Sequence, residues 1–233
     1  MGNLMNARER LTYVEVPKYD KDTAVREIES DAPDRIVLAL LALAFYDTDW
    51  RRVQNHCVRL SNNPNDNVRG TAILCLGYIA RFRGTLDTDL AVPLVIDAMS
   101  DPDAFVRGNA ADALDDILLF CIPENYDRAM ALELLRSERV DEILLGLFGI
   151  ARSDGDSEFA QGKCFEYSTH PNEAIRGQAL KGFATIVYEH RHIDVEKVMR
   201  VLSEAAERDG YAAECARSAI ECIETYLQAD DSD

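Results

Sequence analysis

A ten-residue pattern that occurs three times constrains the fold of this chain more than any other feature. Each copy has a turn residue, a proline, an Asn or Asp, an aliphatic residue, Arg-Gly and then Ala. The copies align without gaps at Asn63–Ala72, Asp101–Ala110 and His170–Ala179. A repeat of this kind predicts stacked units, because each unit can bury its apolar face only against its neighbours.

The central copy predicts a helix that begins at its proline. Asp101 can cap the first turn, and Pro102 at the first helical position loses no useful N–H. Ahead of this copy, Leu90–Met99 is predicted as a second helix with Pro93 inside its early turns, where proline bends a helix. In the central copy, the apolar residues at helical spacing are Val106, Ala110, Ala113, Leu114 and Ile117.

This paired pattern resembles the HEAT-repeat family, particularly its short bacterial branch of phycobilisome-lyase type. In that branch a helix with a proline is followed by a tight Asp-Pro-Asp turn and a second helix that opens with Val-Arg. Leu90–Ile117 carries the resemblance, and the copies at Pro64 and Pro171 extend it. The resemblance implies an all-α, right-handed α-solenoid in which the second helix of each pair lines a concave face.

Helix pairs of roughly 35 residues follow one another from Tyr19 onward, a period typical of helical solenoids. We expect one HEAT-like repeat domain over residues 19–227, made of about six pairs. Residues 1–18 are predicted to form an N-terminal arm that caps the first repeat, and residues 228–233 a frayed acidic tail. The predicted pairs are 20–46, 50–82, 87–120, 126–152, 158–188 and 194–227.

A second, longer repeat overlies the first. Shifting the sequence by 107 positions brings identical residues together at many places. We therefore predict a duplicated block of three helix pairs, with pseudo-repeats at 19–125 and 126–227. The aligned pairs include Tyr19-Asp20 with Tyr126-Asp127, Gln54 with Gln161, Cys57 with Cys164, Arg69-Gly70 with Arg176-Gly177, and Asp87 with Asp194.

Two second helices are apolar nearly all round, Ile36–Phe45 and its counterpart Ile143–Ala151. A helix of that kind must be buried on every side or dock a partner. Neighbours on both sides can bury the second of them. The first lies near an end, so we expect the N-terminal arm, or otherwise a partner, to cover it.

Charge excludes one class of function. The chain has 42 acidic and 25 basic residues and a formal net charge of −17. Nucleic-acid binding needs a basic surface, so we expect no nucleic acid as a partner. An acidic surface accelerates encounters with basic proteins, although solubility alone also explains acidic chains.

The compartment is predicted to be the cytoplasm. No apolar run is long enough to span a bilayer, and we expect no membrane partner. The N-terminal residues lack a secretory signal and a myristoylation motif. Six cysteines without a Cys-x-x-Cys pair indicate buried free thiols in a reducing environment.

Candidate catalytic and metal-binding residues are few, and we expect neither a catalytic site nor a cofactor. The two histidines of Glu189–His192 are two positions apart, so they do not share a helical face. HEAT-like deoxyhypusine hydroxylases carry several His-Glu pairs on successive helices, a pattern that this sequence lacks. The pairs Asp47/Asp49 and Asp154/Asp156 are explained by helix capping better than by calcium, because their spacing is not that of an EF-hand.

Two groups of arginines are interpreted structurally. Arg81-Phe82-Arg83 is basic and aromatic, as on the inner surface of HEAT-like alkylpurine DNA glycosylases, but a helix C-terminus favours basic residues anyway. Arg69, Arg107 and Arg176 stand near helix starts, against the helix dipole. We therefore expect each of them to bond a carboxylate or carbonyl of the neighbouring repeat.

The remaining candidate site is a surface on the second helices. An aromatic and aliphatic centre with a charged rim is typical of a protein interface. The alternative is an ordinary solvated helix face, since acidic faces are common. The outward positions of these helices are expected to include Thr71 and Gln178. The predicted partner-binding residues are Leu74, Tyr78, Asn109, Asp112, Asp115, Asp116 and Lys181.

The leading functional hypothesis is a non-catalytic protein-binding module that grips a basic protein on an acidic concave face. Among bacterial proteins of this kind it resembles an immunity protein that neutralises a toxin domain, because acidic charge gives fast capture of a basic target. The alternatives are a subunit of a bilin-lyase-like enzyme, which acts as a pair of subunits, and a general adaptor with several weak partners.

Overall fold

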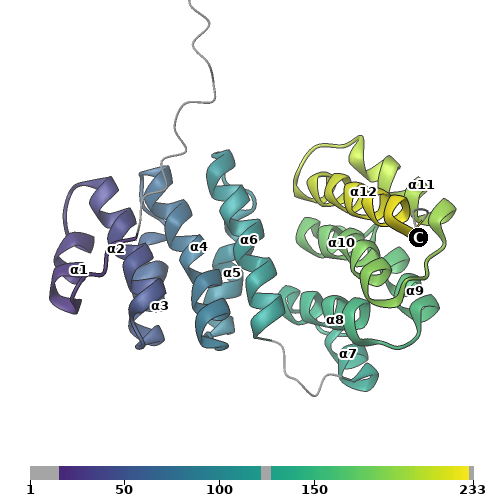
Figure 1. Ribbon diagram of the computed structural model, residues 1–233, viewed down its shortest axis with the longest axis horizontal. Coiled ribbons are helices and arrows are strands. Elements are labelled where there is room, and N and C mark those ends of the chain that lie inside the picture. The colour runs from purple at the N-terminus through teal and green to yellow at the C-terminus, as the bar shows by residue number, and fades with distance from the viewer. Residues whose placement is uncertain (1–15, 122–126, 231–233) are drawn as a thin grey trace, which may run out of the picture.

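The computed structural model describes residues 16–121 and 127–230, and over these residues the chain contains α-helices and no strand. The helices follow one another in antiparallel pairs, which confirms the expected α-solenoid (Figure 1). Their bounds are α1 Lys21–Ile28, α2 Pro33–Tyr46, α3 Trp50–Leu60, α4 Asp66–Arg83, α5 Thr88–Ala98, α6 Ala104–Phe120, α7 Arg128–Leu134, α8 Val140–Ser153, α9 Ser157–Tyr167, α10 Glu173–His190, α11 Val195–Ala206 and α12 Tyr211–Asp230.

The six predicted pairs correspond to α1/α2, α3/α4, α5/α6, α7/α8, α9/α10 and α11/α12, with differences of a few residues at their ends. The largest difference is at α12, which continues to Asp230, so residues 228–230 are helical. Residues 1–15, which make up most of the predicted N-terminal arm, lie outside the described residues, and the role of the arm as a cap stays a prediction.

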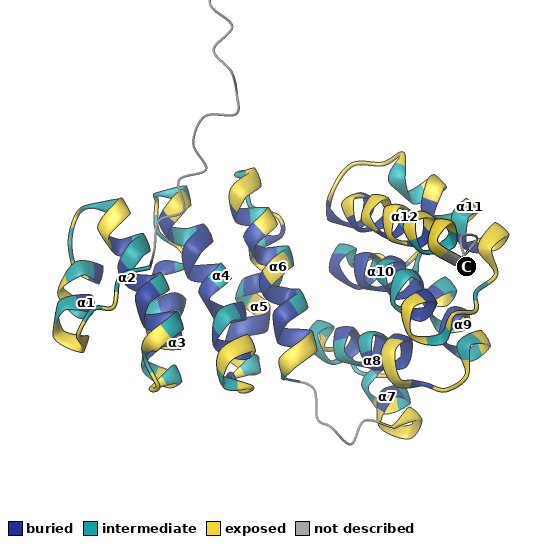
Figure 2. Cartoon of the chain, viewed as in Figure 1, coloured by how far each residue is buried: buried dark blue, intermediate teal, exposed yellow. Residues whose placement is uncertain are grey.

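The even-numbered helices form one layer of the solenoid. Within each half the even-numbered helices pack on one another in order, α2 on α4 on α6 and α8 on α10 on α12, and each odd-numbered helix packs on its own partner. Buried residues lie mainly where the helices face one another, and exposed residues lie mainly on the outer turns (Figure 2). The core is therefore continuous along each half.

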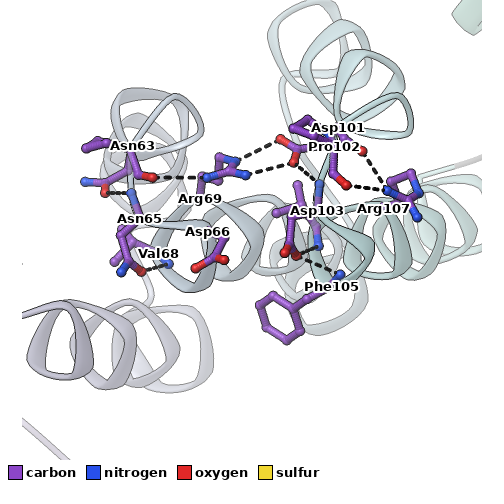
Figure 3. A network of polar contacts seen from close by, with 12 residues as sticks. Asn63, Asn65, Asp66, Val68, Arg69, Asp101, Pro102, Asp103, Phe105 and Arg107 are labelled. Atoms are coloured by element: carbon purple, nitrogen blue, oxygen red, sulfur yellow. Dashed lines mark hydrogen bonds and ion pairs between the residues drawn. The ribbon is translucent and has the colours of Figure 1, made fainter.

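The repeated ten-residue pattern forms a doubly capped turn (Figure 3). Its third residue is the N-cap: the side chain of Asp103 accepts hydrogen bonds from the backbone N–H groups of Phe105 and Val106. Asn65 and Asn172 cap α4 and α10 in the same way. The prediction that Asp101 caps this helix with Pro102 at its first position was wrong, because α6 begins two residues later at Ala104.

The first residue of the pattern shapes the turn instead. The side chain of Asp101 accepts a hydrogen bond of 2.8 Å from the backbone N–H of Asp103. Asn63 makes the same bond to the N–H of Asn65, and His170 accepts from that of Asn172 through Nδ1. Asp, Asn and His therefore perform one task here, because each presents an acceptor two residues before the N-cap.

The repeated arginine also serves its own turn. Arg69, Arg107 and Arg176 each donate a hydrogen bond to the carbonyl of the proline five residues earlier, at 3.3, 3.0 and 3.3 Å. The expected bond to a neighbouring repeat exists only for Arg69, which donates two hydrogen bonds of 2.8 Å to Asp101. For Arg107 and Arg176 that expectation was wrong, since carbonyls of their own turns lie within reach.

Gln54 and Gln161, which stand 107 positions apart, make the same contact, as the proposed duplication predicts. The buried side chain of Gln54 accepts a hydrogen bond of 2.9 Å from the backbone N–H of Asp87. Gln161 accepts one of 2.8 Å from the N–H of Asp194. In both halves a buried amide thus ties the first helix of one pair to the start of the next pair.

The two halves meet at a bend. Figure 1 shows α1–α6 standing side by side, whereas the helices of the second half lie across that direction. The helix α8 packs closely on α10 but touches α6 at few residues. Ion pairs bridge the bend, from Lys181 to Asp115 at 2.5 Å and from Arg139 to Asp89 at 2.6 Å.

Among the glycines of the three Arg-Gly pairs, the one at this bend, Gly108, has different surroundings from the other two. A Cβ at Gly70 would lie 2.9 Å from the ring of Phe105, and one at Gly177 would lie 2.6 Å from the ring of Tyr211. In both places an aromatic ring of the next even-numbered helix packs directly on the glycine. At Gly108 a Cβ would meet no described atom within 4 Å, because the following helix α8 turns away.

Alanine substitutions at these glycines should act in opposite directions. Gly70→Ala and Gly177→Ala place a methyl group against a ring, so each should lower the free energy of unfolding by ~1–3 kcal/mol. Gly108→Ala is the matched control in open space, and it should raise that free energy by ~0.5–1 kcal/mol through helix propensity. Urea denaturation followed by circular dichroism measures all three. A destabilised Gly108→Ala variant would contradict the bend.

Candidate protein-binding face

The even-numbered layer is concave at the bend. Lys181 on α10 reaches Asp115 on α6, two pairs away, with its Nζ 2.5 Å from both carboxylate oxygens. Helices that are two pairs apart can touch only if the layer curves inward over the helix between them, which is α8. We call the surface around this contact the inner face, formed by Leu74, Tyr78, Arg81, Asp112, Asp115, Asp116 and Lys181.

A second carboxylate of the inner face, that of Asp116, forms an ion pair with another cation of the chain, Arg81. Arg81 near the C-terminus of α4 donates hydrogen bonds of 3.1 and 2.6 Å to Asp116 on α6. The same guanidinium lies 5.9 Å from the ring centre of Phe120. The bonds to Asp116 raise the pKa of Arg81, so the group stays charged.

Asp112 is the carboxylate of this cluster for which the described residues provide no hydrogen-bond or ion-pair partner. It is exposed and lies between the two internal ion pairs, near Tyr78 and Arg81. Partial burial raises its pKa, and the negative charges of Asp115 and Asp116 raise it further. An incoming cation would relieve this repulsion, so Asp112 is the group of the face that is best placed to receive one.

Several predicted partner-binding residues are less accessible than expected. Asn109 is 8% exposed and Asp116 is 4% exposed, and both lie against α4. Leu74 and Tyr78 are half-buried rather than exposed, and Thr71 and Gln178, expected to point outward, are buried. The helices α4 and α6 come close, since a Cβ at Gly77 would lie 2.7 Å from Cα of Ala113, and this close approach covers neighbouring side chains.

Aromatic side chains extend from the inner face along the C-terminal ends of α2, α4 and α6. The ring centre of Phe45 lies 5.2 Å from that of Tyr78 and 5.0 Å from that of Phe82. Phe82 is 41% exposed, Tyr46 43% and Phe120 38%. We call Phe45, Tyr46, Tyr78, Phe82 and Phe120 the ring row. Exposed rings at contact distance are typical of interfaces, because they bury much area at little entropic cost.

Arg81, Phe82 and Phe120 were not predicted to bind a partner. Arg81 was explained by the helix dipole, whereas it pairs with Asp116. The equivalent face of the second half has different chemistry: Arg152 lies 5.9 Å from the ring centre of Phe148 and stands 107 positions after Phe45. Comparing aligned positions of the two halves for a change of charge would have found this difference.

Other candidate chemistry is explained by structure. Asp49 and Asp156 cap α3 and α9, and Asp47 and Asp154 each accept a hydrogen bond from the backbone N–H two residues on. In the described part of the chain no group of His, Cys, Asp and Glu is arranged to hold a metal ion. The six cysteines are free, and four of them are buried. None of the helices described is long and apolar enough to cross a membrane.

Comparison with known proteins identifies the repeat. Residues 57–149, from α3 into α8, match the family described as HEAT repeats, which confirms the resemblance for this part of the chain. No curated protein sequence matches the chain.

Solved structures with similar chains include two repeat proteins and an engineered protein. A designed armadillo repeat protein is 15% identical, with 86% of this chain and 98% of that chain covered and a TM-score of 0.38. An engineered protein solved as a structural genomics target is 15% identical, with coverages of 88% and 96% and a TM-score of 0.39. An archaeal HEAT-like repeats protein from Thermococcus onnurineus NA1 is 16% identical, with coverages of 90% and 98% and a TM-score of 0.37.

The substitutions Asp112→Asn and Asp101→Asn should change stability in opposite directions. The pKa of Asp112 is raised in the folded state, so its ionisation opposes folding as the pH rises through that pKa. Considering the described residues alone, Asp112→Asn should therefore raise Tm at pH 7, by only ~1–2 °C because the side chain is exposed. A cation supplied to Asp112 from outside the described residues would reverse the sign of this change. The bonds from Arg69 lower the pKa of Asp101, so its stabilisation is present above the unfolded pKa and is lost as the pH falls through the folded one.

Asp101→Asn should consequently lower Tm at pH 7, and both differences should shrink towards pH ~2, where the carboxylates are protonated. Thermal unfolding followed by circular dichroism at the two pH values gives all the differences needed. Equal shifts of the two variants at pH 7 would contradict the assignment of Asp112 as the carboxylate without a cation.

Proposed function

We propose that this HEAT-repeat chain is a non-catalytic protein-binding module that holds a basic partner on its inner face. The single observation that carries the proposal is the position of Asp112, an exposed carboxylate without a described partner beside half-buried Tyr78. A cation placed there gains a charge-assisted bond at the edge of an aromatic surface. That combination favours an Arg or Lys side chain of another protein.

The charges of the face set its net preference. Lys181 and Arg81 already neutralise Asp115 and Asp116, so Asp112 supplies the uncompensated negative charge of the cluster. Around this site the whole chain has a net charge of −17, which attracts basic proteins over longer distances. The carboxylate of Asp112 would fix the position of the partner on the face, and the net charge of the chain would accelerate association.

A basic toxin domain that the chain neutralises is the specific partner that fits this proposal. An immunity protein has to capture its toxin before the toxin acts, and opposite net charges accelerate association. A large face formed by successive helices also covers more of a folded domain than one helix pair would.

The test is affinity capture from an extract of the source organism with three immobilised proteins: the native chain, Asp112→Lys and Glu204→Lys. Glu204 is an exposed residue of α11, so its variant is a control with the same change of net charge. A basic protein should be retained by the native chain and by Glu204→Lys, and its retention should fall about tenfold with Asp112→Lys.

Salt separates the electrostatic part of the proposal from the rest. Retention of the captured protein should weaken between low and high ionic strength, because long-range attraction is screened. Equal capture by Asp112→Lys and Glu204→Lys would reject the inner face as the binding site. An acidic partner, or one retained equally at all salt concentrations, would reject the electrostatic mechanism.

A further inference from the structure

The exposed ring row is an apolar surface that continues to the point where the described chain begins. Val16 lies at the end of α2, where its carbonyl accepts a hydrogen bond of 3.5 Å from the hydroxyl of Tyr46. The ammonium group of Lys18 stands 5.3 Å from the centre of the same ring. Val16 and Lys18 therefore contact Tyr46, a member of the ring row, and the preceding fifteen residues are joined to the described chain at this point.

We propose that residues 8–15 of this chain bind along the ring row, from Tyr46 past Phe82 to Asp112. In this arrangement the apolar part of the segment covers the rings of α2 and α4. Its basic part reaches the carboxylate of α6 that has no described partner. The occupant of the surface is thus a segment of the same chain.

The order of residues in the segment matches the order of chemistry on the surface. Leu11, Thr12, Tyr13 and Val14 come directly before Glu15, and Arg8 and Arg10 come before them. Going back from Val16, the chain therefore offers Glu15, then apolar and aromatic side chains, and then the cations Arg10 and Arg8 on either side of Glu9. Going outward from Tyr46, the protein offers first exposed rings and then Asp112.

The lengths agree as well. Arg10 precedes Val16 by six residues, and six extended residues span ~20 Å. Asp112 lies on α6, two helices away from α2 within the even-numbered layer. Neighbouring helix axes are ~8–10 Å apart, so two spacings amount to ~16–20 Å. An extended segment anchored at Val16 can therefore span the layer from α2 to α6.

Tethering makes such a contact effective even if each part is weak. A segment joined directly to its site has an effective concentration in the millimolar range, so a modest affinity fills the site. The inference does not depend on the partner proposed above. It concerns the free chain and can be tested on the free chain.

The experiment compares backbone amide resonances of the full ¹⁵N-labelled chain with those of arm variants. Tyr13→Asp and Arg10→Glu should shift the resonances of residues 78–83 and 112–120, which are far from the substitutions in sequence. Asn3→Asp, a change in the same arm before the proposed segment, is the matched control and should leave these resonances in place. Arm substitutions leave the described core intact, so failure to fold does not obscure the result.

The reciprocal variants are made on the surface. Phe82→Ala should move the resonances of residues 11–14 towards the values of a solvated chain, and Asp112→Asn should move those of Arg8 and Arg10. Tyr188→Ala removes another exposed ring, 77% exposed on α10, and should have no such effect.

Two outcomes would overturn the proposal. In the first, the arm variants shift only resonances close to them in sequence. In the second, the resonances of the ring row change with protein concentration and not with the arm variants, which would assign the surface to a second copy of the chain.

Discussion

Direct packing of each second helix on the next is the interaction on which this structure depends. Between α4 and α6 and between α10 and α12 it requires a glycine in the earlier helix, because the ring of Phe105 or Tyr211 occupies the space that a Cβ at Gly70 or Gly177 would fill. The turn before each of these glycines is fixed by an N-cap, a side-chain acceptor and an arginine bonded to a proline carbonyl. At these two places the ten-residue pattern thus contains both the turn and the glycine on which the next second helix packs.

At the bend the direct packing of one second helix on the next is nearly absent, since α6 and α8 touch at few residues. After α6 the next second helix does not return to Gly108, and the halves are joined across the bend by the ion pairs of Lys181 and Arg139. The layer turns inward here, and α10 faces α6. The same departure from regular stacking therefore produces the concave inner face.

The inner face is less acidic than the composition suggests. Of the three carboxylates on α6, two bind cations of the chain itself, and these pairs hold α4 and α10 against α6. Their first role is structural. What remains for recognition is one carboxylate beside a row of rings, which is a more selective surface than a uniformly negative one. Both proposals made here, for a partner and for the chain's own arm, depend on this arrangement.

The sequence alone determined the helix pairs and their period, and it aligned the two glutamines that make equivalent contacts, while the duplication stays a prediction. These properties depend on local capping and on residues at fixed separations, which a repeat displays directly. It did not reveal that Asn109 and Asp116 are buried, that Arg81 binds Asp116, or that the stack bends after α6. Helical periodicity gives only the direction of a side chain about its own helix axis. How closely the helices pack decides whether a side chain reaches solvent, a neighbouring helix or a distant partner. Asp115, for example, pairs with Lys181, a cation 66 residues away.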